Sequence, residues 1–167
     1  MKPERLQNLI GTLALTISDD LLKESSHLVP RDEPAAAIAL VGRSPGWTIR
    51  QLSTDLVLSH AATVRLVDRL VDDGLMRRRR SATDGRAVAL SLTSKGQSLY
   101  QEMLVRRHQR LGELLSSLTD EEKHALGVIG EKLLVLIAKT TDNRSRACRF
   151  CDTESCRRCP FDVALST

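Results

Sequence analysis

Residues 48–96 constrain this chain more than any other segment, because helix, turn and strand patterns follow one another there in a fixed order. An amphipathic helix pattern covers residues 48–56, and a turn covers 57–59. A second helix pattern runs over 60–74 and closes on a glycine, and a basic hairpin pattern occupies 75–93. A helix of this kind followed by a cationic hairpin predicts a helix-turn-helix with a β-wing, an architecture that fits the major groove of DNA.

Capping signals indicate the same boundaries. Three capping boxes are expected, in Thr48 with Gln51, Ser94 with Gln97, and Thr119 with Glu122. Ser59 is a natural N-cap for the second helix of the pair, because its hydroxyl can accept a backbone N–H. Gly74 suits the left-handed position that follows that helix. The later boxes predict a long helix from Ser94 to about Ser117 and a last helix after Thr119.

The distribution of charge favours a nucleic-acid partner. The formal net charge is only +4, but five of the 25 basic residues lie within residues 77–86. Such clustering is typical of phosphate binding, and the alternative is a solvated charged turn. Aromatic residues make up only 2% of the chain, so its core must consist of aliphatic side chains. No signal peptide or membrane span is recognisable, which favours a cytoplasmic protein without a membrane partner.

We expect a mainly α fold with a small β-wing, divided into four parts. They are an N-terminal dimerisation helix and loop (1–33), a winged helix-turn-helix lobe (34–96), a long helix with a dimerisation helix (97–142), and a cysteine-rich tail (143–167). Apolar residues recur at helical spacing in the first and last helices. Such faces favour burial against a second copy of the chain, although the two helices can also pack on each other within one chain.

The sequence TIRQLSTDLVLSHAATVRLVDRLVDDGLMRRRRSATDGRAVALSLTSKG (Thr48–Gly96), followed by LTDEEKHAL (Leu118–Leu126), resembles the MarR family of bacterial transcription regulators. The resemblance extends over about residues 1–140, and its most specific parts are RLVDRLVDDGLMRR and the DGR and LSLTSKG pieces of the wing. It implies an obligate homodimer with interlocking terminal helices. It also implies binding to palindromic operators, usually for repression, and release of DNA when a small molecule, metal or oxidant acts on the dimer.

The beginning of the second helix supplies the candidate base contacts, because only the N-terminal residues of a recognition helix reach base edges. These candidates are Ser59, His60, Ala62 and Thr63. His60 can equally be a solvent-facing residue at the start of a helix. Arg65 and Arg69 are four residues apart and are expected to hold phosphates, with Asp68 partly neutralising them. The opposite face is expected to belong to the core, through Val64, Val67, Leu70 and Val71.

Arginines dominate the hairpin. Residues 77–80 are all arginine, and Arg78 and Arg80 are our candidates for DNA contact, because alternate side chains share one face of a strand. By resemblance to the family, Asp84 and Arg86 match its wing pair. Asp84 would then orient the arginine, and Arg86 would enter the minor groove, where A·T-rich sequence gives the most negative potential.

The tail departs from the family. All four cysteines of the chain lie within it as two C-x-x-C pairs, Cys148 with Cys151 and Cys156 with Cys159. This spacing predicts a metal site with four thiolate ligands, for which zinc is the first choice. An iron–sulfur cluster is the alternative, since it also takes four cysteines, and metal-free redox thiols are the third possibility. The site can be structural or can sense metal or redox state.

Two other functions stay open. A non-specific architectural DNA-binding protein would use the same basic wing, but with little preference for one sequence. A thiol redox enzyme would use the cysteines, but no histidine stands beside them in the sequence, and the chain is therefore not expected to be an enzyme. A small-molecule effector would draw on a set of residues that more often form plain core or helix surface: Trp47, Tyr100, Met103 and Arg106.

Overall fold

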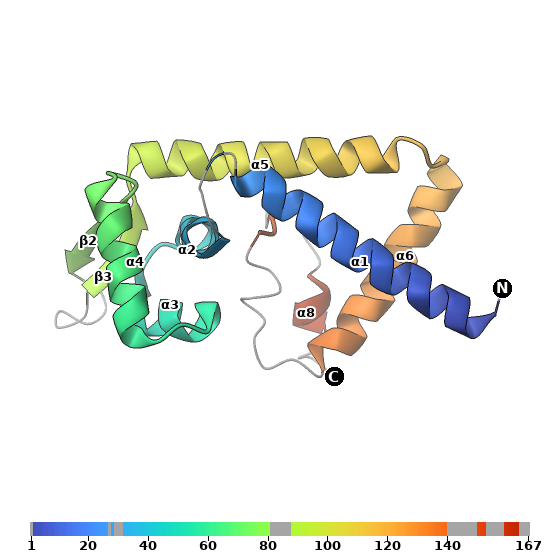
Figure 1. Ribbon diagram of the computed structural model, residues 1–167, viewed down its shortest axis with the longest axis horizontal. Helices are drawn as coiled ribbons and strands as arrows, with labels where there is room; N and C mark the ends of the chain where they lie inside the picture. The colour runs from blue at the N-terminus through green and yellow to red at the C-terminus, as the bar shows by residue number, and fades with distance from the viewer. Residues whose placement is uncertain are drawn as a thin grey trace.

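The computed structural model of the chain describes residues 2–26, 28, 32–80, 88–139, 150–152 and 159–163. In chain order the elements are α1 (Pro3–Ser26), α2 (Asp32–Arg43), β1 (Trp47–Thr48), α3 (Ile49–Leu56), α4 (His60–Asp72), β2 (Met76–Arg80), β3 (Val88–Leu92), α5 (Ser94–Leu115), α6 (Asp120–Ala138) and α8 (Pro160–Val163). Figure 1 shows a mainly helical molecule with a small sheet at one end, which confirms the predicted fold class.

Residues 32–92 form a winged-helix lobe around an aliphatic core. Residues 35–41 of α2 are all buried and run through its centre. Leu52 from α3, Leu66 from α4 and Leu90 from β3 pack in the same core, which Tyr100 of α5 also enters. The abundance of alanine in α2 lets neighbouring elements approach closely, so the lobe packs with few aromatic side chains.

The sheet is antiparallel with strand order β1-β3-β2. Its register pairs Met76 with Leu92 and Arg80 with Val88, so β2 and β3 form the predicted hairpin. The two-residue strand β1 adds an edge, with Trp47 opposite Leu90. A strand this short carries no alternation of side chains, which is why the sequence analysis did not predict it.

Two of the three predicted capping boxes are confirmed. The Thr48 N–H donates to Oε1 of Gln51 at 2.9 Å and the Gln51 N–H donates to Oγ1 of Thr48 at 3.2 Å. Thr119 and Glu122 form the same reciprocal pair at the start of α6. The box at Ser94 was wrong by one residue, since Thr93 is the N-cap of α5. Thr93 follows directly after β3, and its Oγ1 accepts the N–H of Gly96 at 3.1 Å.

A junction of residues 73–75 and 93–96 joins the end of α4 to the beginning of α5. Gly74 takes the predicted left-handed conformation with φ +68°. Its carbonyl accepts a hydrogen bond from Oγ1 of Thr93 at 2.6 Å. The ammonium of Lys95 donates to the carbonyl of Asp73 at 2.9 Å, where a cation also complements the negative end of α4. The two helices are therefore held in one fixed relation.

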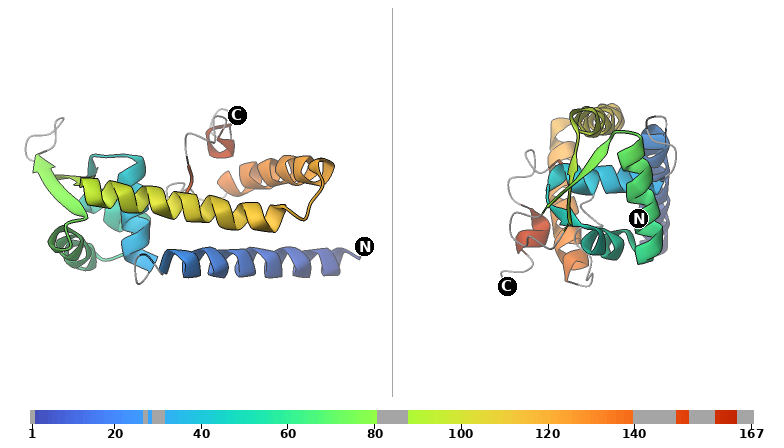
Figure 2. Two further views of the ribbon diagram at one scale, coloured as in Figure 1. Left: turned by 90° about the horizontal axis from the view of Figure 1, so that it is seen from above. Right: turned by 90° about the vertical axis from the view of Figure 1, so that its left-hand side faces the viewer.

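The helices α1, α5 and α6 extend away from the lobe and form a frame. Figures 1 and 2 show α5 running from the lobe along much of the molecule, with α1 on one side of it and α6 folded back on the other. An ion pair between Arg110 of α5 and Asp20 of α1 links two of these helices and raises the pKa of Arg110 through its hydrogen bond to that carboxylate. None of the described helices is long and apolar enough to cross a membrane.

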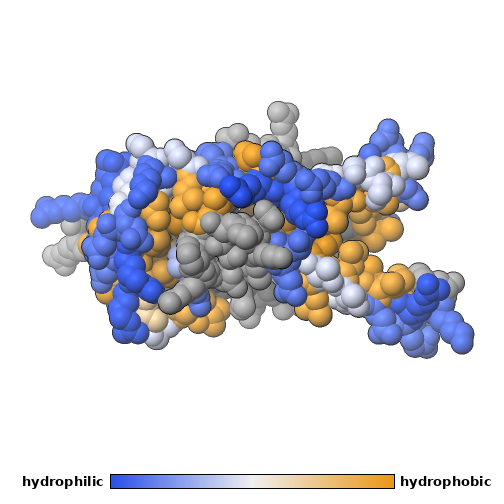
Figure 3. Space-filling model, turned by 45° about the horizontal axis from the view of Figure 1, so that its top comes forward, coloured by the Kyte–Doolittle hydropathy of each residue, from blue (hydrophilic) through white to orange (hydrophobic). Residues whose placement is uncertain are grey.

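The apolar faces of α1 and α6 remain largely uncovered. No residue of α6 is buried. The large apolar side chains exposed on these two helices include Leu6, Leu9, Ile10, Leu13, Leu126, Ile129, Leu133, Leu136 and Ile137. Figure 3 shows apolar surface in the half of the molecule that the frame helices form. Within one chain, then, α1 and α6 do not bury these faces against each other.

Gly96 offers a test of the junction. A Cβ on Gly96 would overlap the backbone carbonyl of Leu75, which cannot move without displacing the chain. We expect Gly96→Ala to lower the free energy of unfolding by about 1–3 kcal/mol, the range for overpacking a filled site. Gly112→Ala is the matched control in the same helix, because a Cβ there meets no atom within 4 Å. Denaturant unfolding of both variants checks this, and equal stability of the two would contradict the contact.

Candidate nucleic-acid interface

The turn between α3 and α4 is tight. Val57 adopts the left-handed region with φ +55°, and its N–H donates to the carbonyl of Thr54 at 3.2 Å. Leu58 continues the turn, with its N–H on the carbonyl of Ser53 at 3.0 Å. A β-branched residue rarely takes this conformation, so the sequence did not indicate it. The turn sets the crossing of the two helices and leaves the start of α4 at the surface.

Ser59 is the N-cap of α4, as predicted. Its Oγ accepts the N–H of Ala62 at 3.2 Å. Its side chain is exposed, so the hydroxyl hydrogen remains available to a partner outside the protein. Ala62 lies half-buried on the flank of the helix.

Thr63 does not lie on the exposed face. Its side chain has no exposed surface, and its Oγ1 donates to the carbonyl of Ser59 at 3.1 Å. The prediction that Thr63 contacts bases was therefore wrong. Thr63 precedes Leu66 and Val67 by three and four residues, and helical periodicity places all three on the buried side. That spacing was the signal that could have excluded it.

The outer face of α4 consists of His60, Ala61, Val64, Arg65 and Asp68. Of these, His60, Ala61 and Arg65 are exposed and Val64 is half-buried. The assignment of Val64 to the core was wrong, because it follows His60 by one helical turn and shares its side of the helix. Ala61 is exposed on the same side of the helix but was not among the predicted residues. The prediction used distance from the N-cap and did not use the helix face that the core residues define.

An ion pair connects the recognition helix to the wing. The guanidinium of Arg78 on β2 donates to the carboxylate of Asp68 on α4 at 2.6 Å. Asp68 was expected to neutralise Arg65 and Arg69 partly, but the arginine that it pairs with, Arg78, lies on the strand. The register explains this: Arg78 shares its face of the hairpin with Met76, whose side chain is buried toward the helices.

The four arginines of β2 are all exposed. Nε of Arg77 donates to Oγ of Ser91 on the neighbouring strand at 3.1 Å. Arg80 ends the strand opposite Val88. Asp84 and Arg86 lie outside the described residues, so their roles stay predictions. The described part of the wing thus exposes four cations, of which Arg78 lies beside the outer face of α4.

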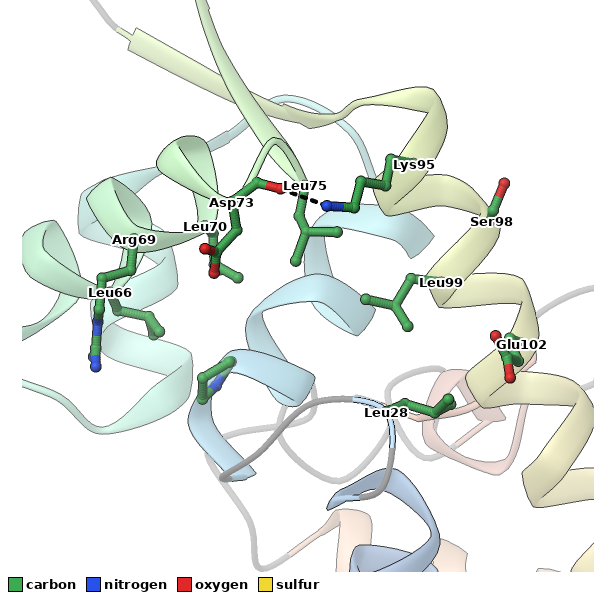
Figure 4. A pocket seen from close by; sticks show the side chains of 11 residues that line it. Leu28, Leu66, Arg69, Leu70, Asp73, Leu75, Lys95, Ser98, Leu99 and Glu102 are labelled. Carbon is green, nitrogen blue, oxygen red and sulfur yellow. Dashed lines mark hydrogen bonds between the residues drawn. The ribbon is translucent and has the colours of Figure 1, made fainter.

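A cavity of about 700 Å³ lies between the end of α4, the start of α2 and α5. Figure 4 shows its mostly apolar lining, with Leu66 and Leu70 on one side and Leu99 on the other. Arg69 is exposed and lines it too, and its predicted contact with phosphates stays a prediction. None of the four residues considered for an effector pocket belongs to this lining, and Tyr100 and Met103 are buried core.

Two of the four cysteines are described. Cys151 and Cys159 are both partly buried. Cys148 and Cys156 lie outside the described residues. Among the described part of the chain, no three histidine, cysteine, aspartate or glutamate side chains gather closely enough to hold a metal ion. The predicted four-cysteine site therefore stays a prediction.

Known proteins share this sequence pattern and fold. The MarR family model matches residues 32–87. The transcriptional regulator BilQ of Clostridium symbiosum is 32% identical over 96 residues, which cover 58% of this chain and 67% of BilQ. The chain belongs to the MarR family.

Two further proteins are similar to this chain. The transcriptional repressor MprA of Escherichia coli is 38% identical over 84 residues, which cover 50% of this chain and 48% of MprA. The crystal structure of FabT of Streptococcus pneumoniae in complex with DNA has the same fold, with a TM-score of 0.67 and 21% identity over 81% of this chain and 99% of FabT. This MarR-family chain thus spans two thirds of BilQ, about half of MprA and nearly all of FabT.

Removing the charge of Asp68 tests the ion pair between Asp68 and Arg78. Asp68→Asn removes a negative charge beside the wing, so DNA should bind more tightly and the slope of log affinity against log salt should steepen by up to about one unit. The control is Asp120→Asn, which breaks the Asp120–Lys123 pair at the far end of the molecule (Figure 1) with the same change in net charge. Fluorescence anisotropy at several salt concentrations measures both. An equal effect of the two variants would mean that Asp68 is not near the DNA.

Proposed function

We propose that this MarR-family protein is a homodimeric regulator that represses transcription by binding palindromic operator DNA. The observation that carries the proposal is the juxtaposition of the exposed face of α4 with the arginines of β2, linked by Asp68 and Arg78. FabT, which has the same fold, is described in a complex with DNA, and MprA is named a repressor. Both descriptions support the proposal by analogy.

The first turn of α4 would enter the major groove. Ser59 and His60 carry groups that can hydrogen-bond to base edges, and the methyl groups of Ala61 and Val64 can contact a thymine methyl. Arg65 is exposed one turn along and would reach the phosphate backbone. The wing would follow into the minor groove through Arg86, with Arg80 near the backbone.

The uncovered faces of α1 and α6 support the dimer. Full burial of a large apolar side chain contributes about 1.5–3 kcal/mol, and at least nine such side chains on these two helices are still about half exposed, so each would add about half of that in an interface. A two-fold dimer built on these faces would present two copies of α4. Recognition helices of such dimers meet half-sites about 34 Å apart on DNA.

The cysteine-rich tail would bind a metal through Cys148, Cys151, Cys156 and Cys159, with zinc preferred and an iron–sulfur cluster as the alternative. Thiolates in two C-x-x-C turns are the donor set that both groups require. Bound zinc would supply a rigid centre for a tail that is too small to build its own core. A redox-active cluster would in addition make the tail a sensor.

The cavity beside α4 is the place we propose for a small-molecule effector. Leu70 and Leu75 near the end of α4 and Leu99 of α5 line it, so an occupant would contact both sides of the α4–α5 junction. Its mostly apolar walls fit an apolar ligand body.

Competition separates an operator-specific regulator from an architectural DNA-binding protein. Binding to a labelled fragment of the protein's own promoter should persist through about a thousandfold excess of bulk DNA, since specific sites are bound at least this much more tightly than non-specific ones. Arg86→Ala should weaken this binding and flatten its salt dependence by about one unit of slope. Loss of binding at a small excess of bulk DNA would favour the architectural function.

Two leucines on opposite sides of α1 test the dimer. Leu13 lies on the apolar face with Leu9 and Ile10, whereas Leu15 lies on the other side, and both are at least half exposed. Leu13→Asp should convert the dimer to monomers, because it would bury an unpaired charge in the interface. Leu15→Asp should leave the dimer intact. Sedimentation velocity measures both, and a dimer that survives Leu13→Asp would exclude this face from the interface.

Metal content tests the tail. Protein purified without oxygen should be colourless and contain about one zinc per chain, and Cys151→Ser should lose most of it. Elemental analysis and an absorbance spectrum are sufficient. A brown protein with iron and sulfide that disappear in the variant would replace zinc by a cluster. A protein with neither would leave the cysteines as metal-free thiols.

A further inference from the structure

Val57, in the turn between α3 and α4, has a strained backbone. Among the described residues other than glycine, it alone has a positive φ, at +55° with ψ +42°. In this left-handed region the Cβ of an L-residue crowds the following carbonyl oxygen, and a β-branched side chain adds to the crowding. The other described residues with positive φ are glycines, Gly46 and Gly74, which have no Cβ. The turn thus carries a side chain that raises its conformational energy.

The residues on both sides impose this conformation. Leu56 and Leu58 are partly buried and pack against the core of the lobe. The N–H of Val57 donates to the carbonyl of Thr54 at 3.2 Å. The N–H of Leu58 donates to the carbonyl of Ser53 at 3.0 Å. Because both leucines face the core, position 57 makes the left-handed turn between them whichever residue occupies it.

Packing within the chain does not compensate for the strain at Val57. Its side chain is 65% exposed and does not belong to the core cluster of the lobe. Strained backbone of this kind is concentrated at functional sites. Figure 1 shows α3 and α4 in the lobe, apart from the helices α1 and α6 whose apolar faces would form the dimer. The position of Val57 therefore favours a contact with a molecule other than a second copy of this chain.

The surroundings of Val57 fit duplex DNA. Ser59 and His60, which begin α4 two and three residues further on, are both exposed. Arg65 is exposed on the same helix, and the exposed arginines of β2 add positive charge to the lobe. Base edges in the major groove are mostly polar, and the methyl group of thymine is the apolar group among them. An exposed valine beside polar base-reading groups therefore complements a thymine.

We propose that Val57 contacts the methyl group of a thymine when the first turn of α4 binds an operator half-site. The valine then gains in the complex the burial that it lacks in the free protein. This gain accounts for a valine at a position where glycine would be more stable. The inference rests on the proposed function as a DNA-binding regulator, and it adds Val57 to the residues that determine which sequence is bound.

Val57→Gly separates strain from recognition. Without DNA, this variant should unfold at a temperature about 2–4 °C higher than the wild type, because the crowded Cβ is gone. It should nevertheless bind the promoter fragment about tenfold more weakly, because both half-sites lose the contact. Val105→Ala is the control, since it shortens an exposed apolar side chain of α5 and should leave the affinity unchanged. Scanning calorimetry and fluorescence anisotropy measure the two effects. Unchanged affinity of Val57→Gly, or no rise in its melting temperature, would overturn the proposal.

Deoxyuridine locates the contact on the DNA. Uracil lacks only the methyl group of thymine and keeps its hydrogen-bonding groups. When single thymines of the operator are replaced, wild-type binding should weaken about fourfold at one thymine of each half-site, which is the effect of one buried methyl group. The same replacement should not weaken binding by Val57→Gly, whereas Val57→Ile should keep the wild-type sensitivity because it keeps a branched apolar side chain.

The two failures are distinguishable. If the wild type prefers its promoter to bulk DNA but every deoxyuridine affects the wild type and Val57→Gly equally, the valine contact is absent and the proposed regulator stands. If the wild type shows no preference for its promoter, the proposed function fails, and the contact fails with it.

Discussion

The contact between the end of α4 and the beginning of α5 sets the geometry of the whole molecule. Thr93 and Lys95 donate hydrogen bonds to the last carbonyls of the α4 turn, and Gly96 sits against Leu75 with no space for a side chain. α4 is the helix that would meet DNA, and α5 leads to α6 and the proposed dimer face. These contacts leave little room at the junction, so the end of α4 and the beginning of α5 pack as one unit.

The lobe and the frame differ in how far they bury their apolar side chains. The lobe buries its apolar residues within one chain, around residues 35–41 of α2. The frame leaves comparable side chains of α1 and α6 in water, which is unfavourable for a stable monomer and favours a second copy. Phe150 of the tail packs against the lobe core, and Phe161 is buried in α8, which packs against α6.

Most of the fold and half of the candidate interface could be predicted. The helix-turn-helix, its Thr48–Gln51 box, the Ser59 cap and the hairpin follow from signals that act within one or two helical turns. Thr63 and Val64 were exchanged between core and surface, because the N-terminal rule for base contacts was applied without the face that Leu66 and Val67 define. The N-cap of α5 was missed because Thr93 is also fixed by Gly74, nineteen residues away.

By itself the sequence determined the order of elements, their caps, the basic wing and the spacing of the cysteines. These properties depend on side chains that are close to one another along the chain. Their preferences for helix, turn or strand are strong enough to predict from the sequence. Only the tertiary structure decided that Asp68 pairs with Arg78, that Gly96 must be glycine, and that the tail attaches at Phe150 and Phe161. Each of these depends on elements distant in sequence meeting at a particular angle, which packing fixes and local preference does not.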